Sequence, residues 1–197
     1  MSSIKELITD DGIRIMPKPD FVTYEQIQEC LNKAHQVNEQ KGLVYATAHQ
    51  SVDTLKEKLK DAVTYVALNT ENQVVATASV QFRQISHWYH KGDIALLKLA
   101  GVLPEYSGRN LALLLLLRGF ETKRRRVEVM VTDSAEGNIA IRKLYLGCGF
   151  KVVDCCKYAT NSFISTVYAY WFHGCPFSDE RLLSEYQRHR EILVSQS

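Results

Sequence analysis

The spacing of apolar residues changes after about the first third of the chain, and this change constrains the fold more than any other feature. Thr23–Gln40 and Val52–Lys60 repeat apolar residues every three or four positions, which is the period of amphipathic helices. Val63–Leu68 and Val74–Ile85 are instead rich in β-branched and aromatic residues, and the turn-forming segment Asn69–Gln73 separates them. We therefore predict two helices followed by a β-hairpin.

Strands and helices alternate through the rest of the chain. Ile94–Val102 is mostly apolar and is typical of a central strand, which Pro104 ends because proline has no N–H to donate. The other expected strands are Ile13–Met16, Val127–Val131, Phe150–Lys157 and Phe163–Trp171, and the other expected helices are Arg109–Lys123, Asn138–Leu146 and Ser178–Leu193. This order predicts an α/β (mixed α+β) protein whose central sheet carries helices on both faces.

Length and charge limit the class of protein. The 197 residues contain no repeat, low-complexity tract or Pro/Gly/Ser-rich linker, so we predict one domain, 1–197. The 24 Lys and Arg against 22 Asp and Glu leave a net charge of +2, which gives no support for a nucleic-acid binder. The longest apolar run, Leu111–Leu117, is far shorter than the ~20 residues of a membrane span, and the N-terminus has no signal-like stretch. We expect a cytoplasmic protein with no membrane partner.

The five cysteines are an odd number and include no C-x-x-C pair. Neither a disulfide framework nor a zinc site is indicated, so no metal is expected. The adjacent Cys155 and Cys156 suggest a redox site, but two residues of one strand that face opposite sides are the simpler interpretation.

The segment Leu99–Ala112 carries the first functional signal. A buried strand ends, a turn containing Gly108 follows, and a helix opens. The free amides and the dipole of a helix N-terminus favour an anion such as a phosphate or pyrophosphate. Gly108 allows a close backbone approach, and Arg109 can add a charged contact. Taken alone, an ordinary strand–helix loop explains this segment equally well.

A second segment, Asn138–Phe150, follows beyond one more strand and gives the first a more specific meaning. The pair resembles the GCN5-related N-acetyltransferase (GNAT) superfamily, whose patterns read V-x-P-x-x-R-G-x-G-x-G/A and N-x-x-A-x-x-L-Y-x-x-x-G-F. The matching residues are Val102, Pro104, Glu105, Tyr106, Gly108 and Ala112, then Asn138, Leu144, Tyr145, Gly149 and Phe150, with Ala140 or Ile141 near the alanine position. The resemblance covers residues 60–172 and implies a mixed, largely antiparallel central sheet.

Two residues depart from the first pattern. Ser107 stands where Gln or Arg is usual, which removes one side-chain contact, while backbone amides can still hold a pyrophosphate. Asn110 stands where the first glycine is usual. Asparagine is the residue that best tolerates a left-handed backbone after glycine, so we expect the turn and its CoA site to be retained.

The resemblance implies acetyl transfer from acetyl-CoA to an amine of a small molecule or peptide, by direct attack in a ternary complex. Pantetheine would pair with the strand at Leu99, Gly101 and Val102, where a backbone N–H would stabilise the oxyanion and Gly101 would mark a bulge. The diphosphate would bind the amides of the turn, formed by Tyr106, Ser107, Gly108, Arg109, Asn110, Leu111 and Ala112.

Two residues of the second segment would complete the site. Asn138 is similar to the asparagine that contacts CoA in the family, although capping its own helix is equally good chemistry. Tyr145 matches the tyrosine often assigned to protonate the departing thiolate. The alternative for Tyr145 is a core tyrosine with a bonded hydroxyl.

The residue that removes the proton from the amine is not identified by the motifs. Asp93 opens the central strand, and His87 and His90 lie just before it, so each is a candidate general base. Trp88 and Tyr89 beside them would line a substrate pocket. An exposed hairpin end without a catalytic part is the alternative.

Three further hypotheses stay open at this point. A degenerate GNAT domain that binds acyl-CoA without turnover, as a sensor or partner module, is consistent with Ser107 and Asn110. The basic run Lys123–Arg126 suggests contact with nucleic acid or the 3′-phosphate of CoA, although a solvated helix end explains it better. A homodimer is compatible with the sequence, and we expect no nucleic-acid partner.

Overall fold

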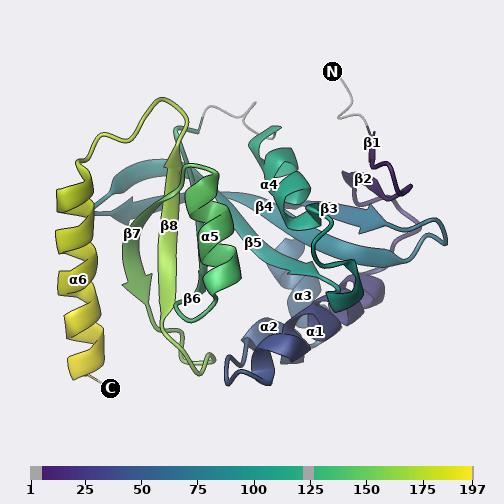
Figure 1. Cartoon of the computed structure of the whole chain (residues 1–197), viewed down its shortest axis with the longest axis horizontal. Helices are drawn as coiled ribbons and strands as arrows, with labels where there is room; N and C mark the ends of the chain where they lie inside the picture. The colour runs from purple at the N-terminus through teal and green to yellow at the C-terminus, as the bar shows by residue number, and fades with distance from the viewer. Residues whose placement is uncertain (1–5, 122–126, 197) are drawn as a thin grey trace. The chain divides into compact units, whose positions relative to one another are not determined.

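The computed structural model describes residues 6–121 and 127–196 (Figure 1). The strands are β1 (Leu7–Ile8), β2 (Arg14–Pro17), β3 (Ala62–Leu68), β4 (Val74–His87), β5 (His90–Val102), β6 (Val129–Ala135), β7 (Lys151–Cys156) and β8 (Ser165–Trp171). The helices are α1 (Tyr24–Glu39), α2 (Ala46–His49), α3 (Val52–Leu59), α4 (Leu111–Glu121), α5 (Ile139–Gly147) and α6 (Asp179–Ser195), with a 3₁₀ turn η1 (Pro104–Tyr106).

The fold class predicted from the sequence is confirmed. The strands follow the order β1-β2-β3-β4-β5-β6-β8-β7 in one mixed sheet. The pairs β1–β2, β2–β3, β3–β4, β6–β8 and β7–β8 are antiparallel, whereas β5 and β6 run parallel. A largely antiparallel sheet with one parallel pair is therefore the frame on which the site residues lie.

Most predicted elements are present, but several of their bounds differ. The helix expected from Arg109 begins at Leu111, because Asn110 has a φ of 59° that no helix accommodates. The strand expected to end at Val131 continues to Ala135, because the polar side chains beyond Val131 lie in a strand that is paired with β8 along its whole length. The two-residue β1 and four-residue α2 were not predicted, since elements this short show no periodicity.

The described residues fall into two compact units. The first comprises residues 6–81 and 97–121, and the second comprises 82–96 and 127–196. The chain enters the second unit partway along β4 and returns to the first partway along β5. Each unit has its own set of packed strands and helices.

In the first unit, α1 and α3 both begin at side-chain caps. The Thr23 side chain accepts a hydrogen bond from the Gln26 amide, and the Gln26 side chain accepts one from the Thr23 amide, which completes a capping box. The Ser51 side chain accepts a hydrogen bond from the Thr54 amide and so caps α3. Figure 1 shows α4 in front of the strands of this unit and α3 behind them. The fully buried side chains between these elements include Ile15, Leu31, Leu55, Leu68 and Leu115.

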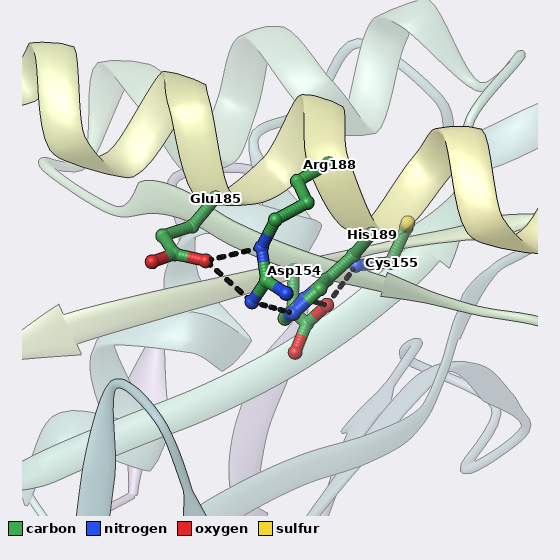
Figure 2. A network of polar contacts seen from close by, with 5 residues as sticks. All are labelled: Asp154, Cys155, Glu185, Arg188 and His189. Carbon is green, nitrogen blue, oxygen red and sulfur yellow. Dashed lines mark hydrogen bonds and ion pairs between the residues drawn. The ribbon is translucent and has the colours of Figure 1, made fainter.

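In the second unit, α6 is attached to the edge strand β7 by a polar network (Figure 2). His189 Nδ1 lies 2.6 Å from Asp154 Oδ1, and Arg188 Nη2 lies 2.9 Å from His189 Nε2. A guanidinium can only donate, so Nε2 accepts and the ring proton is on Nδ1, where it donates to Asp154. Glu185 holds the same guanidinium at 2.7 Å. This network fixes the register of α6 along β7.

Candidate active site

The strand β5 is irregular at Leu99, not at Gly101 as the sequence suggested. Leu99 has a φ of 53°, and a left-handed residue inside a strand interrupts its regular alternation. Gly101 is instead required by packing, because a Cβ built on it lies 2.9 Å from Ala34 Cβ and 3.3 Å from Leu31 Cδ2 of α1. The glycine therefore admits α1 against the strand, and the break lies two residues earlier.

A short turn carries the chain from the end of β5. The Leu103 amide donates to the Val75 carbonyl at 2.9 Å, which ties the strand end to β4. The Ser107 amide donates to the Pro104 carbonyl at 3.1 Å and closes η1. The amides of Leu103, Tyr106 and Ser107 thus have partners within the protein, and the turn to α4 begins after Ser107.

The next residues form a row of amides without protein partners. Gly108 and Asn110 are both left-handed, with φ values of 80° and 59°, which confirms the conformation expected of Asn110. The first helical bond of α4 runs from the Leu114 amide to the Asn110 carbonyl at 2.9 Å. Among the residues that the structure describes, none accepts a hydrogen bond from the amides of residues 108–113. Such a concave run of N–H groups at a helix N-terminus is suited to an anion.

Asn69 supports this turn, and the sequence pattern gave it no such role. Its Oδ1 accepts hydrogen bonds from the Glu71 amide at 3.0 Å and the Gln73 amide at 2.9 Å, which shape the β3–β4 hairpin. Its Nδ2 donates to Tyr106 Oη at 3.2 Å. The hairpin and η1 are therefore held together by one amide side chain.

Arg109 is engaged with protein groups. Its Nη1 lies 2.7 Å from Asp11 Oδ2, and its guanidinium carbon lies 4.9 Å from the ring centre of Tyr106. Hydrogen bonds from Thr9 and Arg109 lower the pKa of the Asp11 carboxyl. The Arg109 side chain remains 46% exposed, so it can exchange Asp11 for an anion from solution.

In the second unit, Asn138 and Tyr145 belong to α5. The Asn138 side chain accepts a hydrogen bond from the Ile141 amide at 3.3 Å and so caps α5. Tyr145 is 5% exposed and packs against Phe150 and Tyr168. Its hydroxyl accepts a hydrogen bond from Thr132 Oγ1 at 3.3 Å, which fixes the phenol relative to β6.

The segment 87–93 contains the candidate bases named from the sequence. His90 Nε2 lies 3.3 Å from the Asp93 carbonyl oxygen, and the Asp93 side chain is exposed. Tyr89 is 5% exposed and stacks on His87 with 5.4 Å between ring centres. Burial raises the pKa of the Tyr89 hydroxyl. Tyr89 thus belongs to the hydrophobic core of the second unit, which corrects its expected place in a substrate pocket.

A carboxyl that the motifs did not indicate lies in β6. Burial raises the pKa of Asp133, while neighbouring Ser165 and Tyr158 hydroxyls act in the opposite direction. A raised carboxyl pKa in the strand that precedes α5 marks a candidate functional group. The sequence gives no signal for it, because Asp133 follows the apolar run that ends at Val131 and looks like a loop residue.

The remaining sequence features add no metal or thiol chemistry to the described residues. No group of three His, Cys, Asp or Glu side chains within residues 6–121 and 127–196 is placed to share a metal ion. Burial raises the pKa of both Cys155 and Cys156 to about 11, which keeps the two thiols protonated at neutral pH and disfavours a redox role. None of the described helices is both long and apolar enough to cross a membrane. Lys123–Arg126 lies outside the described residues.

The structure and the sequence were compared with those of known proteins. No protein-family model matches the sequence, and no curated protein matches it. A chain of the NatC complex bound to Gag peptide and CoA superposes with a TM-score of 0.64, at 15% identity, over 81% of this chain and 98% of its own. NAA60 of Arabidopsis thaliana, in complex with a bisubstrate analogue, gives 0.62 at 13% identity over 82% and 99%. A GNAT family acetyltransferase of Staphylococcus aureus Mu50 gives 0.61 at 15% identity over 80% and 98%.

This chain has the GNAT fold. The resemblance inferred from two motifs is confirmed at the level of fold, although the identities are too low to extend it further. The GNAT pattern led directly to the turn after β5 and to Tyr145. It did not lead to Asn69, Thr132 or Asp133, because their roles arise from contacts between elements that are distant in sequence.

Proposed function

We propose that this chain is an acetyl-CoA-dependent N-acetyltransferase that moves an acetyl group to an amine of a small molecule or peptide. The observation that carries the proposal is the row of unpartnered amides of residues 108–113 between β5 and α4. A Cβ built on Gly108 meets no atom of the described residues within 4 Å, so the backbone there is open to a bound group. The donors and the open space together fit the diphosphate of CoA.

The chain's own residues then supply binding and proton transfer. Acetyl-CoA brings the activated acetyl group, and a backbone N–H near Leu99 would donate to the thioester oxygen as negative charge develops there. The left-handed backbone at Leu99 supports this role, because it interrupts the regular alternation of the strand at the place where pantetheine would pair. Tyr145 would protonate the departing thiolate, and Thr132 holds its phenol in one orientation.

Two measurements, made one after the other, test the proposal. Calorimetry with acetyl-CoA should show one binding site, and thiol release should then appear with at least one member of a panel of primary amines. Absence of acetyl-CoA binding would reject the proposal altogether. Localisation in the cytoplasm and a homodimer stay predictions that these measurements do not address.

One alternative function has structural support. A GNAT domain that binds acyl-CoA without turnover is favoured by the structural roles that Asn138 and Tyr145 already fill as a helix cap and a core tyrosine. Arg109 is likewise paired with Asp11. Acetyl-CoA binding without thiol release for any amine of the panel would favour this module over the enzyme.

A further inference from the structure

Asp11, which the proposed function leaves without a role, lies beside the turn before α4. It belongs to the short turn between β1 and β2, and its Oδ2 lies 2.7 Å from Nη1 of Arg109, 98 positions further along the chain. Both residues belong to the first unit. Arg109 also lies within the row of unpartnered amides of residues 108–113. A protein carboxylate is therefore paired with a side chain of the candidate anion site.

Hydrogen bonds within the β1–β2 turn hold the Asp11 carboxylate in place. The Thr9 hydroxyl donates to Asp11 Oδ1 at 2.5 Å, while Oδ2 faces Arg109. Thr9 is itself held, because its Oγ1 accepts a hydrogen bond from the Ile13 amide at 3.0 Å and its carbonyl accepts one from the Gly12 amide at 2.9 Å. The bonds from Thr9 and Arg109 lower the pKa of Asp11, so the carboxyl is ionised at neutral pH.

The β1–β2 turn is packed against the hairpin that supports the turn before α4. The backbone of Gly12 closely approaches the β3–β4 hairpin, because a Cβ built on this glycine lies 3.3 Å from Thr70 Cγ2. Asn69 of the same hairpin donates to Tyr106 Oη at 3.2 Å. The ion pair is therefore formed between two backbone segments that other contacts already hold close together.

The Arg109 guanidinium can leave Asp11 without loss of the fold. It lies over the Tyr106 ring, with its carbon 4.9 Å from the ring centre, and the Arg109 side chain is 46% exposed. The Asp11 side chain is 43% exposed. Ion pairs this accessible to water contribute little to stability, because solvent screens them. Exchange of Asp11 for another anion therefore costs the protein little.

Two anions would compete for this guanidinium once a ligand is bound. A diphosphate on the amides of residues 108–113 would lie next to the backbone of Arg109, within reach of its long side chain. The diphosphate carries more negative charge than one carboxylate, and arginine pairs with phosphate oxygens through two parallel bonds. A carboxylate in the position of Asp11 therefore opposes binding, because it engages the cation that the ligand needs.

We propose that Asp11 limits the affinity of the anion site by holding Arg109 until a bound diphosphate takes the guanidinium over. The inference rests on the proposed function, in which that diphosphate belongs to acetyl-CoA. Asp11 is an affinity-determining residue in this scheme, and it takes no part in acetyl transfer itself. When the product CoA leaves, Arg109 returns to Asp11, so the carboxylate that weakens binding also favours release.

Asp11→Asn is the principal variant, because asparagine keeps an oxygen for the Thr9 hydroxyl and removes the charge. Calorimetry with acetyl-CoA should show a Kd about two- to fivefold lower than in the parent, the size expected when an exposed ion pair no longer competes. Asp10→Asn is the matched control and should bind like the parent, since Asp10 is exposed and carries the same charge one residue away. Weaker binding in Asp11→Asn would overturn the proposal, because Asp11 would then position Arg109 for the ligand. An equal gain in both variants would overturn it as well.

A double-variant cycle shows whether Asp11 acts through Arg109. Arg109→Gln should raise the Kd for acetyl-CoA by about tenfold, because a charge-assisted bond to phosphate is lost. In that background Asp11→Asn should have no further effect on Kd, since no guanidinium is left to be released. A gain of the same size with and without Arg109 would contradict the proposal. An Arg109→Gln variant that binds acetyl-CoA as tightly as the parent would contradict it too.

Inorganic pyrophosphate keeps this inference separate from acetyl transfer. It carries the diphosphate group alone, and nitrogen-15 NMR of the Gly108 and Asn110 amides in the full chain reports its binding at the turn. Asp11→Asn should lower its Kd by a factor similar to that for acetyl-CoA, and the gain should shrink when NaCl is raised from about 0.05 M to about 0.5 M, because salt screens exposed charges. Tighter pyrophosphate binding without any acetyl-CoA binding would retain the inference and reject the proposed function. Equal pyrophosphate affinity in Asp11→Asn and the parent would reject the inference whether or not acetyl-CoA binds.

Discussion

At the scale of single residues, the chain places two side-chain-bearing residues in left-handed conformations where GNAT sequences usually rely on glycine or on strand geometry. The left-handed Asn110 was predictable, because the motif marks the position and asparagine tolerates the conformation best. The left-handed Leu99 was not, because leucine in an apolar run is typical of a regular strand. A sequence pattern therefore indicates a left-handed residue only where the residue type, such as asparagine, is one that tolerates this conformation.

Asn110 supports a prediction on stability. Asn110→Ala should lower the free energy of unfolding by about 1 kcal/mol, since alanine lacks the local polar contacts that offset a left-handed backbone. Asn110→Gly should leave it unchanged or slightly raised, because glycine adopts this φ freely. Urea unfolding of the three proteins provides the comparison. An alanine variant as stable as the parent would mean that the turn does not keep this φ in solution.

His35 predicts a loss of stability in mild acid. Burial lowers the pKa of His35 to about 4, and its ring stacks on Tyr45 with 4.5 Å between centres. In the unfolded chain the pKa is about 6.5, so the unfolded state binds more protons between these values. Stability is therefore full above about pH 6.5 and falls as the pH drops towards 4, by about 3 kcal/mol in total.

The measurement for His35 is urea unfolding at pH 7 and pH 4.5. His35→Phe keeps an aromatic ring against Tyr45 and cannot take up a proton, so most of the difference between the two pH values should disappear. His49→Phe is the matched control, because His49 is exposed and should leave the difference in place. Equal pH dependence in parent and His35→Phe would show that another group is responsible.

A variant of Tyr145 can distinguish an acetyltransferase from a domain that binds acyl-CoA without turnover. Tyr145→Phe removes only the hydroxyl that Thr132 contacts, so the packing on Phe150 and Tyr168 is retained. We expect kcat to fall at least about tenfold while the affinity for acetyl-CoA changes little, because a general acid acts in the transition state. The control is Tyr168→Phe, a buried tyrosine outside the motif. An unchanged kcat would remove Tyr145 from the mechanism.

At the scale of elements, the long periodic segments were predictable, while the contacts between them were not. The N-caps at which α1 and α3 begin are local, so Thr23 and Ser51 could be assigned from sequence alone. The packing of α1 against β5 depends on residues that are about 70 positions apart and have no sequence signature. The sequence therefore suggested a bulge at Gly101, whereas in the structure this glycine leaves room for α1 to pack against β5.

The contact between Gly101 and Ala34 can be tested as a pair. Gly101→Ala should destabilise the protein by about 1–3 kcal/mol, because its Cβ lies 2.9 Å from Ala34 Cβ and the helix must move. Ala34→Gly removes that clash and costs about 1 kcal/mol by itself in a helix. The double variant should be more stable than the sum of the two effects allows. Strict additivity would place the two residues out of contact.

At the scale of the whole molecule, a net charge of +2 is compatible with an anionic cosubstrate, because the positive potential is local. The amides of residues 108–113 and the N-terminus of α4 supply it without an excess of basic side chains. The sequence could therefore indicate the cosubstrate through one contiguous segment.

Binding of acetyl-CoA should stabilise the folded chain against heat by mass action. At a concentration of 100 times Kd, the gain is about 2.7 kcal/mol, which a thermal melt detects as a rise of several degrees. Gly108→Val should lose most of this gain, because its side chain projects into the open space beside the amides. Gly42→Val is a close control, since Gly42 has a φ of 78° against 80° for Gly108 and its Cβ also meets no neighbour. The two variants should therefore lose a similar amount of stability from backbone strain in the absence of ligand. Only Gly108→Val should fail to be stabilised by acetyl-CoA. An equal stabilisation of both variants by acetyl-CoA would show that the diphosphate binds elsewhere.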